Sequence, residues 1–393
     1  MILDYSFKAV VFLVLLSILV LVHEFGHFLA GRLSGIGVLE FALGLPFTKP
    51  LWTKKLKSGM QISLYPILFG GFVRLLGEDQ EGVSDANRSS NLETSETVKG
   101  DYFYKKDVKT RIAVIVAGVF MNFLLAIVAF YIFLFASGFK IVIPRFANYH
   151  FISPYQSRVV ITFVEKDSPA DQAGLKPSMV VLAADNQQVM ELRKFQEYIK
   201  SHVGVPVGIK LTDLSLQKSY EVHLTPRVNP PSGQGSMGVG LGEAGLINFG
   251  TGSEKLLSGF IYGVDMFRYN IQVIGSLASD SFKHKTAEPL AESVSGPVGI
   301  LGIVGSIIDI GGWQAILALL NFLGMMSMSL AFMNILPIPA MDGGKLLLLL
   351  IEGIFGKKLS PRKENFVNQI GFALIIGLML IISFNDLSKF FRK

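Results

Sequence analysis

Residues that could bind a metal and activate water occur together in one short segment, His23-Glu24-Phe25-Gly26-His27. Residues four apart on an α-helix lie one turn apart on nearly the same face, so both imidazoles can reach one ion. Glu24 lies beside them and can act as a general base toward water and then as a proton donor. Zinc suits this ligand set, because it is four-coordinate and accepts histidine nitrogen. The segment therefore predicts a hydrolytic zinc site.

A catalytic zinc also needs a third protein ligand. The chain of 393 residues contains no cysteine, so that ligand must be a histidine or a carboxylate. The best candidate is Asp342, which follows the segment Asn334-Ile335-Leu336-Pro337-Ile338-Pro339 and precedes two glycines. The prolines break a helix, and irregular backbone at a membrane edge is tolerated where it lines a cavity. Glu40 and Glu352 are alternative ligands, and helix capping is an alternative role for Asp342.

The elements that must position these residues are predicted to cross a membrane. Only 17% of the residues are charged, and a bilayer crossing needs about 20 apolar residues. Four segments qualify: residues 7–29, 112–135, 313–336 and 366–384. The first contains the histidine pair and is too long for a cleaved signal peptide. The net charge of +6 is attributed to loops beside a membrane, so no nucleic-acid partner is expected.

The distribution of Lys and Arg predicts the orientation. The loop over residues 30–110 carries 11 of them and residues 345–365 carry 5, whereas the two termini carry 4 together. The positive-inside bias makes the side of the two loops cytoplasmic. His27 and Asp342 then lie near the cytoplasmic side, and the region over residues 140–300 faces outward. The other four histidines fall on the outward side and are poor ligands: His150, His202, His223 and His284.

The first loop is predicted to form short strands over residues 61–66 and 69–73, joined by a tight turn. The acidic, serine-rich stretch over residues 78–101 is predicted to be a mobile loop.

The outward region alternates between strand-like and helix-like runs over residues 159–228. Residues 229–253 are rich in Gly, Pro and Ser and are predicted to be a linker. Residues 254–285 are amphipathic. They are expected to lie along the membrane surface or to pack on the soluble domain.

The motif His23–His27, the stretch Asn334–Gly344 and the four-span layout together resemble the bacterial site-2 intramembrane zinc metalloproteases, most closely the regulator-of-sigma-E protease group. The resemblance covers nearly the whole chain. Four further segments resemble parts of that family: Pro66–Gly77 its membrane re-entrant β-loop, Ala117–Asn122 the start of its second span, Ser168–Leu175 the opening helix of a bacterial PDZ domain, and Ser295–Ile300 the stretch before its third span.

The resemblance implies a polytopic α-helical membrane protein with four transmembrane helices, a re-entrant β-loop and one inserted PDZ-like α+β domain. It divides the chain into a first membrane half (residues 1–140), an extracytoplasmic PDZ-like domain with linker (141–253), and an amphipathic segment with the second membrane half (254–393). It also implies that His23, His27 and Asp342 bind Zn²⁺ and that Glu24 is the general base.

The same resemblance implies a role in regulated intramembrane proteolysis. The substrates would be single-span membrane proteins, such as anti-sigma factors or signal-peptide remnants, in the bacterial cytoplasmic (inner) membrane. A site-1 protease would act upstream on the same substrate. Asn334 and Pro337 would lie in the substrate-holding segment, although Asn334 could instead make a helix–helix contact. Gly70, Gly71 and Phe72 would pair with the substrate as an edge strand.

Two departures from the family pattern stand out. Met341 replaces a leucine, a change that conserves volume. Ser178-Met179 replaces the Gly-Asp pair that is usual after the PDZ opening helix, which should alter a turn and favours a steric filter over a peptide-binding module. Two other classes of function remain open, a membrane transporter and an inactive membrane-anchored PDZ scaffold.

Overall fold

The computed structural model describes residues 2–68, 70–78, 98–144, 151–153, 155–189, 191–213, 219–285, 295–356 and 361–391. The chain forms two compact units. The first comprises residues 1–129 and 277–393, and the second comprises residues 130–276. The predicted mobile loop over residues 78–101 falls mainly outside the described residues, because 79–97 are not among them.

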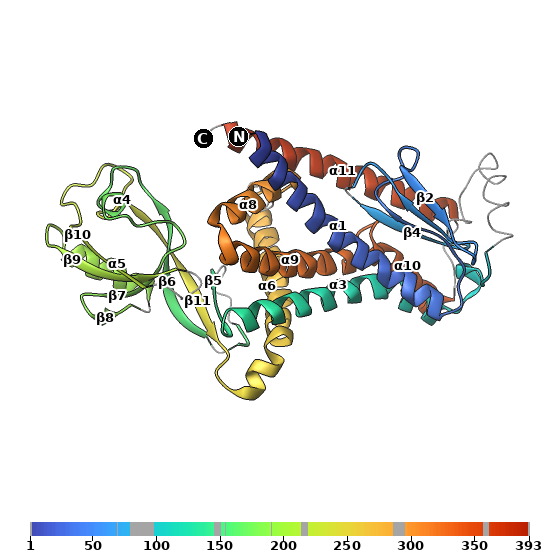
Figure 1. Ribbon diagram of the computed structural model, residues 1–393, viewed down its shortest axis with the longest axis horizontal. Helices are drawn as coiled ribbons and strands as arrows, with labels where there is room; N and C mark the ends of the chain where they lie inside the picture. Colours follow the sequence, from blue (N-terminus) through green and yellow to red (C-terminus); the bar gives the residue numbers. More distant parts are fainter. Residues whose placement is uncertain are drawn as a thin grey trace. The chain divides into compact units, whose positions relative to one another are not determined.

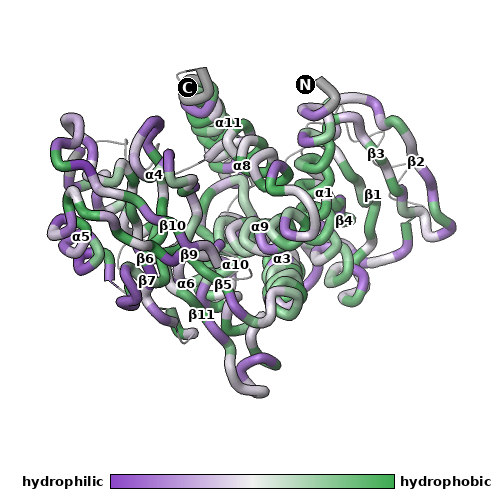
Figure 2. Tube along the Cα trace, turned by 60° about the vertical axis from the view of Figure 1, so that its left-hand side comes forward, coloured by the Kyte–Doolittle hydropathy of each residue, from purple (hydrophilic) through white to green (hydrophobic). Residues whose placement is uncertain are grey.

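Four helices among the described residues are long and apolar enough to cross a membrane. They lie within α1 (Ile2–Leu33), α3 (Val108–Ala136), α9 (Gly312–Ile335) and α11 (Pro361–Phe391). The predicted spans are confirmed as helices; most ends lie further out than predicted, whereas α9 ends at Ile335, one residue before the predicted end. Large apolar side chains such as Leu374, Leu378 and Ile381 on α11 are exposed, as a surface facing lipid requires. Figure 2 shows the hydrophobic colouring along these helices.

Two shorter helices complete the helical part of the first unit. The apolar helix α8 (Pro297–Ile310) packs against α1, α9 and α11. Helix α10 (Asp342–Phe355) follows the proline-rich bend after α9. The side chain of Asp386 on α11 accepts hydrogen bonds from the amides of Gly296 and Gly299, at 2.8 and 2.9 Å. A carboxylate at this position satisfies amide groups that the first turn of α8 leaves free.

A four-stranded sheet lies beside α1 in the first unit (Figure 1). Its strands are β1 (Val38–Leu43), β2 (Trp52–Lys55), β3 (Gln61–Leu64) and β4 (Gly71–Leu75), in the order β2-β3-β1-β4. The two predicted strands exist, but they are not neighbours, because β1 lies between them and pairs with β3 in parallel. Strand β4 is therefore at one edge of the sheet. A 3-10 turn, η2 (Phe103–Lys105), precedes α3.

The second unit contains a seven-stranded sheet with the order β10-β9-β7-β6-β11-β5, and β8 pairs with β7. The strands are β5 (Lys140–Pro144), β6 (Tyr155–Val164), β7 (Val180–Ala184), β8 (Gln187–Gln188), β9 (Val207–Thr212), β10 (Ser219–Leu224) and β11 (Val239–Asn248). Its helices are α4 (Pro169–Gln172), α5 (Leu192–Ser201) and most of α6 (Gly252–His284).

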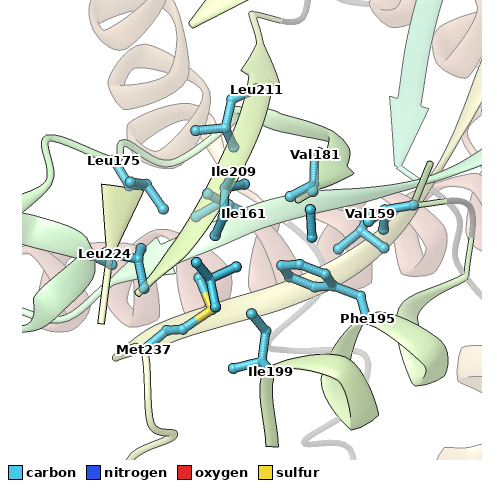
Figure 3. Close-up of a cluster of buried hydrophobic side chains, with 14 residues drawn as sticks. Val159, Ile161, Leu175, Val181, Phe195, Ile199, Ile209, Leu211, Leu224 and Met237 are labelled. Atoms are coloured by element: carbon cyan, nitrogen blue, oxygen red, sulfur yellow. The ribbon is translucent and has the colours of Figure 1, made fainter. Parts of the chain in front are cut away.

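Local sequence explains much of this sheet domain. Asp185 and Asn186 form the two-residue connection from β7 to β8 with φ of 43° and 67°, which a type I′ turn requires and which Asp and Asn tolerate. Phe195 and Ile199, one turn apart on α5, are buried against the sheet. Figure 3 shows them among Val159, Ile161, Val181, Ile209, Leu211 and Met237. Ser178 adopts φ of 71°, so this serine occupies a conformation that favours glycine.

The predicted linker over residues 229–253 is wrong for residues 239–248. These residues form β11, which lies inside the sheet and pairs with both β5 and β6. The alternating glycines of Val239-Gly240-Leu241-Gly242 have low strand propensity, but hydrogen bonds on both sides of the strand override that preference. Composition alone does not show such pairing.

Helix α6 confirms the helical prediction over residues 254–285. One face buries Tyr262, Met266 and Asp265, and the Asp265 side chain accepts hydrogen bonds from the amides of Ile152 and Ser153. The other face exposes Leu256, Leu257 and Phe260. This helix packs within the second unit on one side, as one of the two predicted environments requires, and the membrane-surface alternative stays a prediction.

Candidate metal centre

Three potential ligand atoms converge where α1 meets the first turn of α10. His23 Nε2 and His27 Nε2 are 3.2 Å apart. Asp342 Oδ2 lies 3.0 Å from the first nitrogen and 3.2 Å from the second. Both histidines are buried, at 8% exposure. No other group of three or more His, Asp or Glu residues with such spacing occurs in the described part of the chain.

The donor set fits zinc. Ligand atoms bound to a tetrahedral zinc at its usual bond lengths are about 3.3–3.5 Å apart, close to the observed separations. Asp342 Oδ2 is also buried without a hydrogen-bond partner of suitable geometry, although it faces two imidazole nitrogens. A buried acceptor without a donor is costly, and a cation held by all three atoms would satisfy it.

The charge state of Asp342 suits a ligand. Burial by itself raises the pKa of the Asp342 carboxyl, but the contacts with His23 and His27 outweigh it and hold that pKa below its ordinary value. The carboxyl is therefore ionised at neutral pH, as metal binding requires.

The bend between α9 and α10 places Asp342. It turns through hydrogen bonds from the amide of Ile338 to Leu336 O at 2.7 Å and from the amide of Met341 to Ile338 O at 3.2 Å. A side chain at Gly343 would collide with the carbonyl of Leu336, so the residue after the aspartate must be glycine for the bend to close. The sequence Asp342-Gly343 thus couples the ligand to the bend.

Helix α3 supports both histidines through residues four apart, on one face of the helix. Val114 O accepts a hydrogen bond from His27 Nδ1 at 2.9 Å. The side-chain amide of Asn122 lies 3.2 Å from His23 Nδ1. Between them, Gly118 has no room for a side chain, because a Cβ there would collide with His27 Nε2 and lie 2.9 Å from His23 Cε1. These three residues form a wall behind the imidazoles.

A buried ion pair joins α3 to α10. The Arg111 guanidinium donates to both carboxylate oxygens of Glu352, at 3.0 and 2.5 Å, and to Lys106 O at 3.1 Å. Because this contact is bidentate, it fixes the position of one helix against the other. Asp342 begins the same helix that Glu352 anchors.

Glu24 lies beside the ligands and is held by the sheet. The amide of Val73 on β4 donates to Glu24 Oε2 at 2.9 Å. Gly71 brings the strand close to α1, since a Cβ there would be 2.9 Å from Val20 Cγ1 and 3.6 Å from Glu24 Cγ. The candidate base therefore sits between the histidine pair and the edge strand.

Comparison with known proteins decides the family. The sequence model of Peptidase family M50 matches residues 11–378. The chain belongs to peptidase family M50. Full-length relatives include the metalloprotease MmpA of Caulobacter vibrioides, 28% identical over 96% of this chain and 94% of its own. The zinc metalloprotease RasP of Geobacillus kaustophilus is 27% identical over 97% of each chain, and that of Oceanobacillus iheyensis is 24% identical over 97% of this chain and 99% of its own.

These findings identify a zinc metalloprotease and decide against the alternative of a transporter. The bacterial relatives and the four apolar helices indicate a bacterial membrane protein.

In this M50 peptidase, the three carboxylates that the sequence offers as the third ligand have different partners. Asp342 lies with the histidines. Glu40 instead accepts hydrogen bonds from Tyr65 at 3.1 Å and from Arg74 at 3.0 Å, within the sheet. Glu352 binds Arg111. Of the three candidates, only Asp342 therefore reaches both imidazoles.

The predicted substrate-holding residues lie on two elements, the end of α9 with the bend after it and the strand β4. Asn334, at the end of α9, is buried, and its amide nitrogen is 3.5 Å from His23 Nε2. Pro337 lies exposed in the bend between α9 and α10. Gly71 and Phe72 are on β4, and Gly70 directly precedes it. The Phe72 ring packs against Tyr65, with centroids 5.8 Å apart.

Sequence reasoning missed the contacts that α3 makes in the peptidase. Segment Ala117–Asn122 resembles the start of the family's second span, but that resemblance assigned no role to any residue in it. The available signal was Asn122 itself, a polar residue inside an apolar span, with Gly118 one turn earlier. Polar residues in such spans are costly unless they meet a partner. That partner, the histidine pair, is almost 100 positions away in the chain.

Proposed function

We propose that this M50 peptidase hydrolyses single-span membrane proteins within or beside the bilayer. His23, His27 and Asp342 hold the zinc, and Glu24 is the general base. The observation that carries the proposal is the convergence of three ligand atoms within 3.2 Å of one another, next to Glu24, among helices apolar enough to span a membrane. A soluble peptidase would not need these apolar helices.

Zinc, when bound, polarises a carbonyl oxygen and makes water a stronger acid. Glu24 then takes the proton of the attacking water at its carboxylate and delivers it to the leaving nitrogen. Before a substrate binds, the hydrogen bond from the amide of Val73 holds the Glu24 carboxylate in place. The side-chain amide of Asn334 on α9 can donate a hydrogen bond to a substrate oxygen as negative charge develops on that oxygen.

Edge strand β4 binds the substrate in extended form. A helical substrate hides its amides in its own hydrogen bonds, so it must unwind before water can attack, and an open strand edge can hold the unwound segment. Support comes from the position of β4 at the end of the sheet order and from its contact with Glu24. Because the amide of Val73 is bound to Glu24, a substrate strand at this position competes with that contact.

The second unit restricts access to the site in this proposal. It resembles a PDZ domain in its opening helix, and no candidate metal group occurs among its described residues. A substrate with a bulky outer domain would collide with it, whereas a substrate already trimmed by a site-1 protease would not. Anti-sigma factors and signal-peptide remnants fit this requirement. The proposed location is the bacterial inner membrane, with the PDZ-like unit outside and the zinc near the cytoplasmic side.

Purified protein in detergent tests this function through its zinc content and its cleavage of a single-span test substrate. Glu24→Gln should keep zinc and lower turnover by about 10²–10⁴-fold, since the amide cannot accept the proton. Asp342→Ala should lose zinc. Glu197→Gln, an exposed carboxylate on α5, is the matched control and should behave as the unaltered protein. Near-normal turnover in Glu24→Gln would contradict the base assignment, and full zinc occupancy in Asp342→Ala would contradict the ligand set.

A further inference from the structure

Asn122 is a completely buried amide in the middle of α3. Its side-chain nitrogen lies 3.2 Å from His23 Nδ1, while its side-chain oxygen is buried without a hydrogen-bond partner. Its main-chain carbonyl accepts a hydrogen bond from Ser327 on α9 at 2.7 Å, so the main chain is satisfied independently of the amide. A polar side chain in an apolar span is retained at a cost, which calls for a specific role.

The proton positions on the two histidines decide what that role is. Both rings direct Nε2 at Asp342, so in the proposed zinc site Nε2 supplies the lone pair and Nδ1 carries the hydrogen. The surroundings of His27 agree with this proton assignment, because Val114 O lies next to its Nδ1 and can only accept a hydrogen bond. His23 needs an acceptor as well. An amide nitrogen beside its Nδ1 would place two donors face to face.

Rotating the amide by 180° about the Cβ–Cγ bond exchanges its oxygen and nitrogen without changing its shape, so the assignment follows from the hydrogen bonds that each can make. After the rotation the oxygen lies at hydrogen-bond distance from His23 Nδ1. The same rotation gives the unpartnered oxygen a donor.

We propose that Asn122 is a positioning residue that accepts a hydrogen bond from His23 Nδ1 through its amide oxygen, and so fixes the tautomer and the ring orientation of this histidine. The inference rests on the proposed zinc site. Outer contacts of this kind hold metal-binding histidines in many proteins, and losing one weakens metal affinity by about 10–100-fold.

Three variants separate this role from simple packing. Asn122→Asp keeps the shape and can only accept, so it preserves the proposed bond. Asn122→Leu keeps the approximate volume and removes the acceptor. Ser327→Ala is the matched control, because it removes a buried hydrogen bond to the same residue without touching His23. The readout is the rate at which zinc is lost to an excess of chelator from the full-length protein in detergent.

Asn122→Leu should lose zinc about 10–100-fold faster than the unaltered protein, whereas Asn122→Asp and Ser327→Ala should stay within a few-fold of it. Equal zinc loss from the Asp and Leu variants, or zinc loss from the Leu variant at the unaltered rate, overturns the inference. If the Leu variant does not fold, the Asp variant still tests the inference, because a role of Asn122 as hydrogen-bond donor predicts rapid zinc loss from Asn122→Asp. Undiminished zinc in His23→Ala would instead overturn the zinc site itself.

Discussion

At the scale of single residues, Gly118 sets how closely α3 can approach the histidine pair. Gly118→Ala adds a methyl group that would collide with His27 and press on His23. Overpacking of this kind costs about 1–3 kcal/mol, so zinc affinity should fall about tenfold or more. Measured zinc content and cleavage should decline together, because both depend on the position of the imidazoles.

Gly302 on α8 provides the matched control for that substitution. A Cβ there would meet no atom within 4 Å, so Gly302→Ala should leave zinc binding unchanged. It should also stabilise the helix slightly, by up to about 1 kcal/mol, because alanine has the higher helix propensity. If Gly118→Ala binds zinc as well as Gly302→Ala does, the proposed crowding at the imidazoles is wrong.

At the scale of elements, the Arg111–Glu352 pair holds α10 against α3. Both side chains are mostly buried, at 8% and 14% exposure. Glu352→Ala leaves a buried guanidinium without its partner, which should cost about 3–5 kcal/mol of stability. Thermal unfolding in detergent should show a large decrease in midpoint, and zinc should be lost more easily because Asp342 begins the displaced helix.

A double variant tests whether charge or shape matters for that pair. Arg111→Met with Glu352→Leu removes both charges and fills the space with apolar atoms, which is often tolerated where a single removal is not. It should recover most of the lost stability. A double variant as unstable as Glu352→Ala would show that the ion pair itself is needed.

A second prediction at this scale concerns the edge strand β4. Neighbouring residues of a strand direct their amides to opposite sides, and the amide of Val73 points to Glu24 and away from β1. Val73→Pro removes this donor and should lower cleavage efficiency roughly 2- to 10-fold, with zinc content unchanged. Val73→Ala keeps the amide and is the control.

The kinetic pattern of Val73→Pro separates the two roles of the Val73 amide. Loss of substrate pairing should act mainly on KM, whereas a misplaced Glu24 should lower kcat for every substrate. Cleavage by Val73→Pro at the rate of Val73→Ala would argue against both roles.

At the scale of the whole molecule, most of the sheet domain can be removed while the ladder between β5 and the second half of β11 is kept. A deletion of residues 159–228 would cut β6, which begins at Tyr155 and ends at Val164. It would also remove most of the β6 residues that pair with β11. Pro144 and Ala244 are partners in the β5–β11 ladder, so a short turn in place of residues 145–243 closes a hairpin. This deletion should preserve zinc binding and the cleavage of short substrates.

Cleavage of substrates with an intact outer domain should increase in the same deletion, because the proposed barrier is gone. The control is the full-length protein assayed on the same pair of substrates. If short substrates are no longer cut while zinc is retained, the domain delivers substrate and does not exclude it.

Much of the fold of this peptidase could be predicted because local patterns encode it. Long apolar runs predicted the four spanning helices, and the strand-like and helix-like runs predicted within residues 159–228 correspond to elements such as β9 and α5. The order of strands could not be predicted. The position of β1 between β3 and β4, and the inclusion of β11 in the second sheet, depend on pairing between distant segments.

The sequence by itself determined the chemistry of the site: two imidazoles one helical turn apart, a carboxylate beside them, and no thiol to compete. Only the tertiary structure decided which carboxylate joins them, because Glu40, Asp342 and Glu352 have the same chemistry. Packing of α1, α3 and α10 brings Asp342 to the histidines and gives the other two different partners. The roles of Gly118 and Asn122 have the same origin, since the space and the acceptor that an imidazole needs come from another helix.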